Sequence, residues 1–143
     1  ELENLLQKRA KLSADLQQQL FESYQFLNAE GELKTLLDIF PAVIGHTLVV
    51  PKMPIDQLFD LPDDYLDGYL SFCKPIAHAI QSFTGCKRVN IITIGFEVPH
   101  AHIHLVPMND AKDADILSNK LTMNEEELAA VQRQILTFLN NRG

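Results

Sequence analysis

The chain has 143 residues, of which 46% are hydrophobic and 22% are charged, and its formal net charge is −7 at pH 7. This length suits one domain with a single core, and the composition is that of ordinary globular proteins. No apolar run is long enough to cross a bilayer. The acidity argues against a long nucleic-acid groove, where Lys and Arg must neutralise phosphates. We therefore expect neither nucleic acid nor membrane as a partner, whereas a small phosphorylated ligand needs only local donors and remains compatible.

The two cysteines and the first residues bear on the compartment. Cys73 and Cys86 are too few and too weakly patterned for a disulfide framework or a paired-cysteine metal site. The first residues are amphipathic and glutamine-rich, rather than a basic stretch followed by a small-residue cleavage site, so we expect no signal peptide. Together these features favour a reducing cytoplasm.

The first part of the chain predicts one helix and three strands. Leucines recur at helical spacing over residues 1–22, which indicates an amphipathic helix. Tyr24–Leu27 and Leu33–Asp38 flank turn-forming residues and predict a β-hairpin. Thr47–Val50 is a short β-rich run before Pro51, and it predicts a buried strand.

The second part predicts a long helix followed by two strands. Asp60 is expected to cap the helix and Gly85 to end it, with a kink near Ser71–Pro75 because proline removes a helical hydrogen bond. Val89–Ile94 and His100–Pro107 are separated by a short link. We expect these two strands to be antiparallel neighbours.

A last helix completes the expected order. Asn124 and Glu127 have the spacing of a capping box, which predicts a helix start there. The order is then helix, hairpin, strand, helix, two strands and helix. This order predicts an α+β fold in which an antiparallel β-sheet is combined with a long helix and terminal helices.

Three alternating histidines are the strongest chemical signal. Neighbouring residues of a strand point to opposite faces, so His100, His102 and His104 form one row, whereas Ala101 and Ile103 face the core. A single strand histidine is usually only a hydrogen-bonded polar residue. Three of the five histidines on one accessible face are poorly explained by chance.

Two kinds of chemistry could use this row. Histidine titrates near neutrality, with an unperturbed pKa of about 6.5, so one ring can attack phosphorus while others donate protons. Alternatively, His100, His102 and His46 could hold a zinc ion that activates water. The outer two histidines of the row lie about 13 Å apart by strand geometry, too far to share one metal easily. No Asp or Glu has metal-motif spacing from the row, so we expect no metal or other cofactor.

The histidine row followed by Leu105-Val106 resembles the signature of the histidine triad (HIT) superfamily. Residues 37–41 and 45–52 resemble the other recurring stretch of that family, and residues 97–99 precede the row as in many members. The resemblance extends from Tyr24 to Pro107. It implies a HIT-like domain over residues 23–143, with the helix of residues 1–22 as part of the domain or appended to it.

The resemblance implies a role for each histidine. His102 would be the nucleophile, attacking the α-phosphorus of a nucleotide to form a nucleotidyl-histidine intermediate that water then hydrolyses. His100 and His104 would bind phosphate oxygens and orient His102. His46, from a neighbouring strand, would complete the polar cluster.

The same resemblance implies the ligand and the partner. Asp38 would accept hydrogen bonds from ribose hydroxyls and Ile39 would contact the base of a purine nucleotide. Glu97 and Val98 would lie beside the phosphates, although a carboxylate near phosphate is repulsive unless it turns away or is protonated. Phe96 replaces a glutamine that is common in the family. A homodimer is the expected assembly.

The expected activity is that of a nucleoside phosphoramidase or a related nucleotidyl hydrolase or transferase. An alternative from another class is a nucleotide-binding or scaffold protein with little catalysis, because Glu97 and the short loop before the histidines would disturb phosphate alignment. A dinucleoside polyphosphate hydrolase and the zinc hydrolase rank below these two. The base preference and the leaving group are left open by the sequence.

Overall fold

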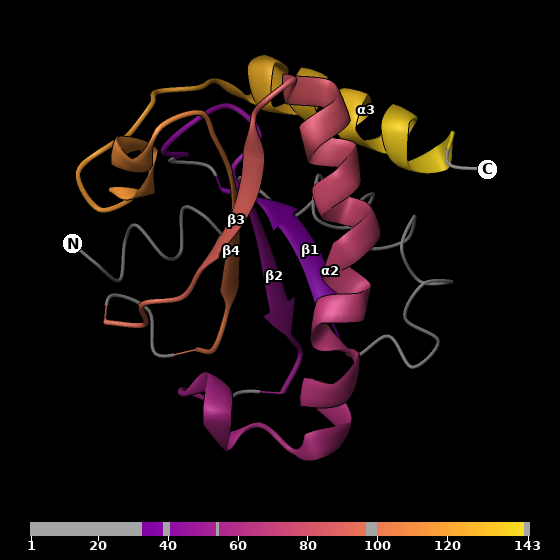
Figure 1. Cartoon of the computed structure of the whole chain (residues 1–143), viewed down its shortest axis with the longest axis vertical. Coiled ribbons are helices and arrows are strands. Elements are labelled where there is room, and N and C mark those ends of the chain that lie inside the picture. Colours follow the sequence, from indigo (N-terminus) through magenta and orange to yellow (C-terminus); the bar gives the residue numbers. More distant parts are fainter. Residues whose placement is uncertain (1–32, 39–40, 54, 97–99, 142–143) are drawn as a thin grey trace.

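The computed structural model describes residues 33–38, 41–53, 55–96 and 100–141, and these form an α+β domain (Figure 1). The elements are β1 (Leu33–Leu37), β2 (Thr47–Pro51), the 3-10 helix η1 (Leu58–Asp60), α2 (Asp63–Thr84), β3 (Arg88–Ile92), β4 (Ile103–Met108), the 3-10 helix η2 (Ala111–Ala114) and α3 (Glu125–Asn140). The expected fold class is confirmed. The helix predicted over residues 1–22 and the hairpin arm Tyr24–Leu27 lie outside the described residues.

The sheet has four strands in the order β1-β2-β4-β3, and every neighbouring pair is antiparallel. This confirms that the two strands after α2 are antiparallel neighbours. Strand β4 is buried along its whole length because it lies between two strands and is covered on both faces. The described helices are too short or too polar to span a lipid bilayer.

Alternation along β4 separates a core face from the opposite face. Ile103 and Leu105 belong to the main core with the buried residues of α2 and α3, and Ala101 joins the same cluster just before the strand. Val106 and Met108 point the other way, into a smaller cluster. The predicted inward direction of the residues between the histidines is therefore confirmed. Helix α2 packs along the sheet and α3 packs against α2 (Figure 1).

Helix α2 differs from its prediction at the start. Asp60 is not its cap, because Asp60 closes the 3-10 turn with Gln57, and Pro62 stands at the cap position without a side-chain hydrogen bond. The end is as predicted, since Gly85 adopts the left-handed conformation with φ of 68°. The helix continues through Pro75, where buried residues of the neighbouring turns pack into the core. The capping box of Asn124 and Glu127 is present at the start of α3.

Helix α2 carries two buried ionisable side chains, Tyr69 and Cys73, in the core between the helix and the sheet. The hydroxyl of Tyr69 donates a hydrogen bond to the carbonyl oxygen of Val49 on β2. Burial raises the pKa of this phenol well above its usual range, and burial also raises the pKa of the Cys73 thiol to about 12. Both groups are therefore neutral at physiological pH. They add no charge to the core between α2 and the sheet.

The two strands around the histidines are shorter than predicted. Strand β4 begins at Ile103, so His100 and His102 precede the strand instead of lying in it. The cause is a change of partner: the backbone N–H of Ala101 donates to the carbonyl oxygen of Ile55, at 2.7 Å, beyond the end of β2. Strand β3 likewise ends at Ile92. The histidine segment therefore leaves the sheet while keeping the alternation of inner and outer side chains.

Gly45 is required by the turn that leads into β2. Its φ is 96°, and a Cβ built on it would lie 3.0 Å from Cγ2 of Thr84 and 3.4 Å from Cγ of Pro107. We expect Gly45→Ala to lower the free energy of unfolding by about 2 kcal/mol, because the left-handed conformation and the close contact both disfavour a side chain. Urea denaturation would measure the change.

Gly68→Ala is the matched control, since Gly68 lies in α2 with open space around it, and it should stabilise the helix. Equal effects of the two substitutions would contradict the role of Gly45.

Candidate functional site

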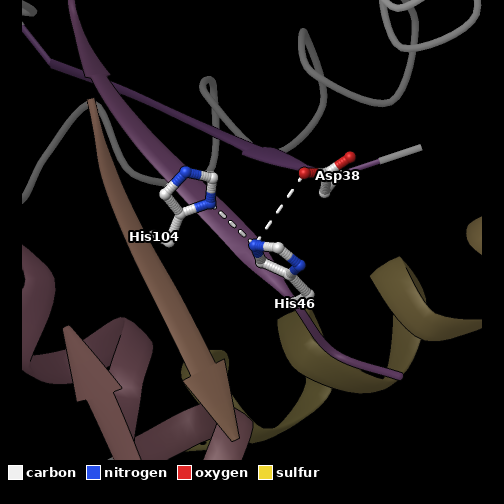
Figure 2. A group of neighbouring side chains, drawn as sticks. All are labelled: Asp38, His46 and His104. Atoms are coloured by element: carbon white, nitrogen blue, oxygen red, sulfur yellow. Dashed lines mark hydrogen bonds and ion pairs between the residues drawn. The ribbon is translucent and has the colours of Figure 1, made fainter. Parts of the chain in front are cut away.

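A buried cluster of Asp38, His46 and His104 lies where β1, β2 and β4 meet (Figure 2). His46 immediately precedes β2, and His104 lies on β4 opposite Leu48 of β2. Nε2 of His46 is 2.8 Å from Nδ1 of His104, and it is 3.8 Å from a carboxylate oxygen of Asp38. The structure thus places His46 beside one histidine of the predicted row, His104.

Hydrogen bonds fix where the protons of this pair lie. The backbone N–H of Ala42 donates to Nδ1 of His46 at 3.0 Å, so this nitrogen carries no proton and Nε2 must carry it. The Nε2–H of His46 then donates to Nδ1 of His104. Neutral His104 consequently has its own proton on Nε2. The pair forms a relay in which each ring determines the tautomer of the next.

His102 has the opposite tautomer. Its Nδ1 lies 2.7 Å from the carbonyl oxygen of His100, and because a carbonyl can only accept, Nδ1 carries the proton. Nε2 therefore keeps an unprotonated lone pair. The His102 ring stands edge-on to the ring of His104, with 4.7 Å between their centroids. The hydroxyl of Thr93 donates to the carbonyl oxygen of His102 at 2.8 Å, which fixes the backbone at this point.

His100 is held by the last residue of β2, Pro51. Its Nε2 donates to the carbonyl oxygen of Pro51 at 2.8 Å, so one ring nitrogen is already used by the backbone. The structure thus connects His100 to the site mainly through its own carbonyl oxygen, which orients His102. The predicted contact of His100 with phosphate oxygens stays a prediction.

Asp38 is buried, with 2% of its surface exposed, and its carboxylate faces His46. Its backbone N–H also donates to the carbonyl oxygen of His46 at 3.1 Å, which ties the end of β1 to the start of β2. The predicted contact with ribose hydroxyls stays a prediction. Ile39, Glu97 and Val98, expected at the base and the phosphates, lie outside the described residues.

A pocket of about 470 Å³ opens beside His102. Its walls are residues 56–59 before α2 and residues 93–96 after β3, together with Ala101 and His102. Phe96 was noted from the sequence, whereas residues 56–59 were missed. An exposed loop far away in the chain carries no periodic or motif signal, so only the fold reveals that it faces His102.

The buried cluster of Asp38, His46 and His104 also has side chains that could hold a metal ion. Within the described part of the chain, one group of three such side chains is close enough: ligand atoms of Asp38, His46 and His104 all lie within 4.8 Å of one another. The set expected for a zinc hydrolase, which combined His46 with His100 and His102, is not this group. Nε2 of His100 and Nδ1 of His102 are instead bonded to backbone carbonyl oxygens.

Comparisons with known proteins agree with the fold and the histidine pattern. The model of the HIT domain family matches residues 21–111, which include all four histidines of the site. An adenosine 5'-monophosphoramidase of Saccharomyces cerevisiae is 37% identical over 82 residues, 57% of this chain and 52% of that protein. An asymmetrical bis(5'-nucleosyl)-tetraphosphatase of Schizosaccharomyces pombe is 26% identical over 102 residues, 66% of this chain and 56% of that protein. The chain therefore spans about half the length of these two relatives.

A solved structure supports the same assignment. A zinc-bound histidine triad family protein from Mycobacterium smegmatis is 30% identical, with a TM-score of 0.60 over 76% of this chain and 81% of that one. The family model covers well over half of the sequence, and the neighbouring structure shares the α+β arrangement. The chain belongs to the HIT family.

Proposed function

We propose that the protein is a nucleotide hydrolase or transferase that attacks the α-phosphorus of a purine nucleotide conjugate through Nε2 of His102. The observation that carries the proposal is the hydrogen bond from Nδ1 of His102 to the carbonyl oxygen of His100, which leaves Nε2 unprotonated. A neutral imidazole nitrogen with a free lone pair is a competent nucleophile near neutral pH. The relatives named as a phosphoramidase and a tetraphosphatase support this class of activity.

The reaction would proceed in two displacements. Nε2 of His102 forms a bond to phosphorus while the bond from phosphorus to the leaving nitrogen breaks, and the departing amine takes a proton from solvent. Water then attacks the same phosphorus, the bond to His102 breaks, and a nucleoside monophosphate and one proton are released. In both steps the Nε2–H of His104 would donate to a phosphate oxygen, because the relay from His46 places the proton there.

The decisive experiment is a substrate panel. Adenosine and guanosine phosphoramidates and dinucleoside polyphosphates would be incubated with the wild type and with His102→Ala, and monophosphate release would be measured. We expect phosphoramidates to be hydrolysed by the wild type, and rapid quenching to trap a nucleotidyl adduct on His102 by mass spectrometry. Turnover of the whole panel by His102→Ala at the wild-type rate would overturn the proposal.

A second candidate is a nucleotide-binding protein with little turnover. Phe96 supports it, because this side chain is 94% exposed where the family commonly has a glutamine that helps to hold the phosphates. Such a protein would bind AMP tightly and release no monophosphate from any compound of the panel. The same panel therefore separates the two candidates.

The proposed chemistry needs no metal ion, which leads to a prediction for zinc. We expect EDTA to leave turnover unchanged, whereas added Zn²⁺ should inhibit. Zinc bound by Asp38, His46 and His104 would replace the Nε2 proton of His46. This proton makes the hydrogen bond to Nδ1 of His104, so the tautomer of His104 would no longer be held. Turnover with increasing Zn²⁺, followed by addition of EDTA, would measure this effect. Activity that is lost in EDTA and restored by Zn²⁺ would instead support the zinc hydrolase.

We also infer that the protein is a homodimer. In the described sheet β3 is an edge strand, and Ile91 on that strand is 49% exposed, so this edge offers an apolar side chain to the matching strand of a second copy. Size-exclusion chromatography with light scattering should give twice the mass of the chain. A monomer at micromolar concentration would contradict the inference.

A further inference from the structure

The pocket beside His102 has an unusual lining for a surface cavity. Phe59 and Phe96, one from each of its two walls, are 89% and 94% exposed. Exposing two large aromatic side chains in one pocket leaves a substantial apolar area in contact with water, which is typical of ligand sites. Its volume of about 470 Å³ is within the range of small-molecule pockets.

The position of this pocket relative to the histidines indicates what part of a substrate it would receive. A series of contacts runs from Asp38 through His46 and His104 to His102, and of these four residues His102 is the one that lines the pocket. If Asp38 marks the nucleoside end, as the resemblance to the HIT family predicts, phosphorus lies at His102. The pocket is then beyond the phosphorus, where the leaving group must lie.

The charge of the lining indicates the chemical class of the leaving group. Among the described residues that line the pocket, Asp56 is the charged one, and none of them is Lys or Arg. A polyphosphate leaving group carries several negative charges, so the carboxylate of Asp56 would repel it. An amine is neutral or positive and meets no such repulsion. The lining therefore favours cleavage of a phosphorus–nitrogen bond over cleavage of a phosphoanhydride.

We propose that this pocket is a leaving-group subsite that selects nucleoside phosphoramidates whose amine carries an aromatic ring. Phe59 and Phe96 would contact the ring from the two walls, and Asp56 would disfavour polyphosphates. This inference rests on the proposed function, since it assumes that the α-phosphorus lies at His102. An aromatic contact of this kind contributes about tenfold to recognition.

The kinetic test compares matched substrates. Adenosine phosphoramidates of an aryl-bearing amine and of a short alkyl amine, together with diadenosine tetraphosphate, would be assayed with the wild type, Phe59→Ala and Phe96→Ala. We expect the ratio of kcat/KM for the aryl over the alkyl compound to fall about tenfold in each variant. Phe138→Ala is the control, because Phe138 is an exposed phenylalanine on α3 outside this pocket, and it should keep the wild-type ratio. A ratio unchanged by both pocket substitutions would overturn the proposal.

Asp56→Asn tests the charge argument. Removing the carboxylate should raise kcat/KM for diadenosine tetraphosphate relative to the alkyl phosphoramidate by several-fold. An unchanged ratio would show that the carboxylate does not exclude polyphosphates and would overturn that part of the proposal.

A binding measurement separates failure of this inference from failure of the proposed function. Affinities of AMP and of the two phosphoramidates would be measured by calorimetry for His102→Ala and for His102→Ala combined with Phe59→Ala. Loss of the aryl preference with unchanged AMP affinity supports the subsite, even if the wild type hydrolyses nothing. Weaker AMP binding in the combined variant would mean that the pocket holds the nucleoside, and this would overturn the inference.

Discussion

His102→Ala is expected to lower kcat/KM for a nucleoside phosphoramidate by at least roughly 10³-fold, or about 4 kcal/mol of transition-state stabilisation. The reason is that Nε2 of His102 is the unprotonated nitrogen of a ring that lines the pocket, so its removal leaves water to attack phosphorus directly. Binding of the nucleotide should persist, because alanine removes the nucleophile and keeps the neighbouring pair of His46 and His104. Steady-state kinetics and AMP titration on the same variant would measure both quantities.

The control for this prediction is His78, the one histidine of the chain that is not part of the site. His78 is exposed on α2, away from the cluster, so His78→Ala removes an imidazole with little effect on the site. We expect its kcat/KM to remain near the wild-type value. Comparable losses in the two variants would show that the drop reflects general damage to the protein, and nearly full activity of His102→Ala would assign the nucleophile elsewhere.

The sequence alone was sufficient for the fold class and for the faces of the histidine segment. Alternation of apolar and polar residues is a local signal, so the burial of Ala101 and Ile103 could be predicted from two-residue spacing. The capping box at Asn124 and the stop at Gly85 are local in the same way. Each depends on residues only a few positions apart, which is the range over which sequence patterns are informative.

The start of β4 could not be predicted in this way. His100 and His102 fit a strand pattern, yet the segment pairs with Ile55 and Pro51, which lie far away in the chain. The tautomer of His102 follows from this departure, because the chain there turns the carbonyl oxygen of His100 toward Nδ1. The detail that determines reactivity therefore depends on long-range contacts.

The same limit applies to Asp38. Its place at the end of a strand was evident, but the direction of its carboxylate depends on how β1 and β2 pair, since their register places Leu37 opposite Thr47. That pairing brings the carboxylate within 3.8 Å of His46. A residue expected to face a ribose hydroxyl thus also adjoins the histidine relay, and it would connect nucleotide binding to the protonation of the relay.

His46→Ala is expected to damage both stability and catalysis. It leaves the N–H of Ala42 and Nδ1 of His104 without this partner in a buried site, which should lower the free energy of unfolding by about 3 kcal/mol. Without His46, the proton of His104 is no longer held on Nε2. The Nε2–H that should donate to the phosphate is therefore lost in part of the molecules. We expect a loss of roughly 10- to 100-fold in kcat/KM. Urea denaturation and steady-state kinetics would measure the two effects.

Two conservative substitutions of His46 distinguish the positioning role from a merely structural one. The His46→Asn variant would offer an amide oxygen near the place of Nδ1, which could accept from Ala42, whereas the His46→Gln variant would offer an amide N–H near the place of Nε2, which could donate to His104. If the relay sets the His104 tautomer, His46→Gln should retain more activity than His46→Asn, and ¹⁵N NMR should show the His104 proton on Nε2 only in the former. Equal activities with equal His104 spectra would mean that His46 acts through packing alone. The comparison is informative because both variants keep a neutral polar side chain in the same buried space, so a difference between them must come from which hydrogen bond survives.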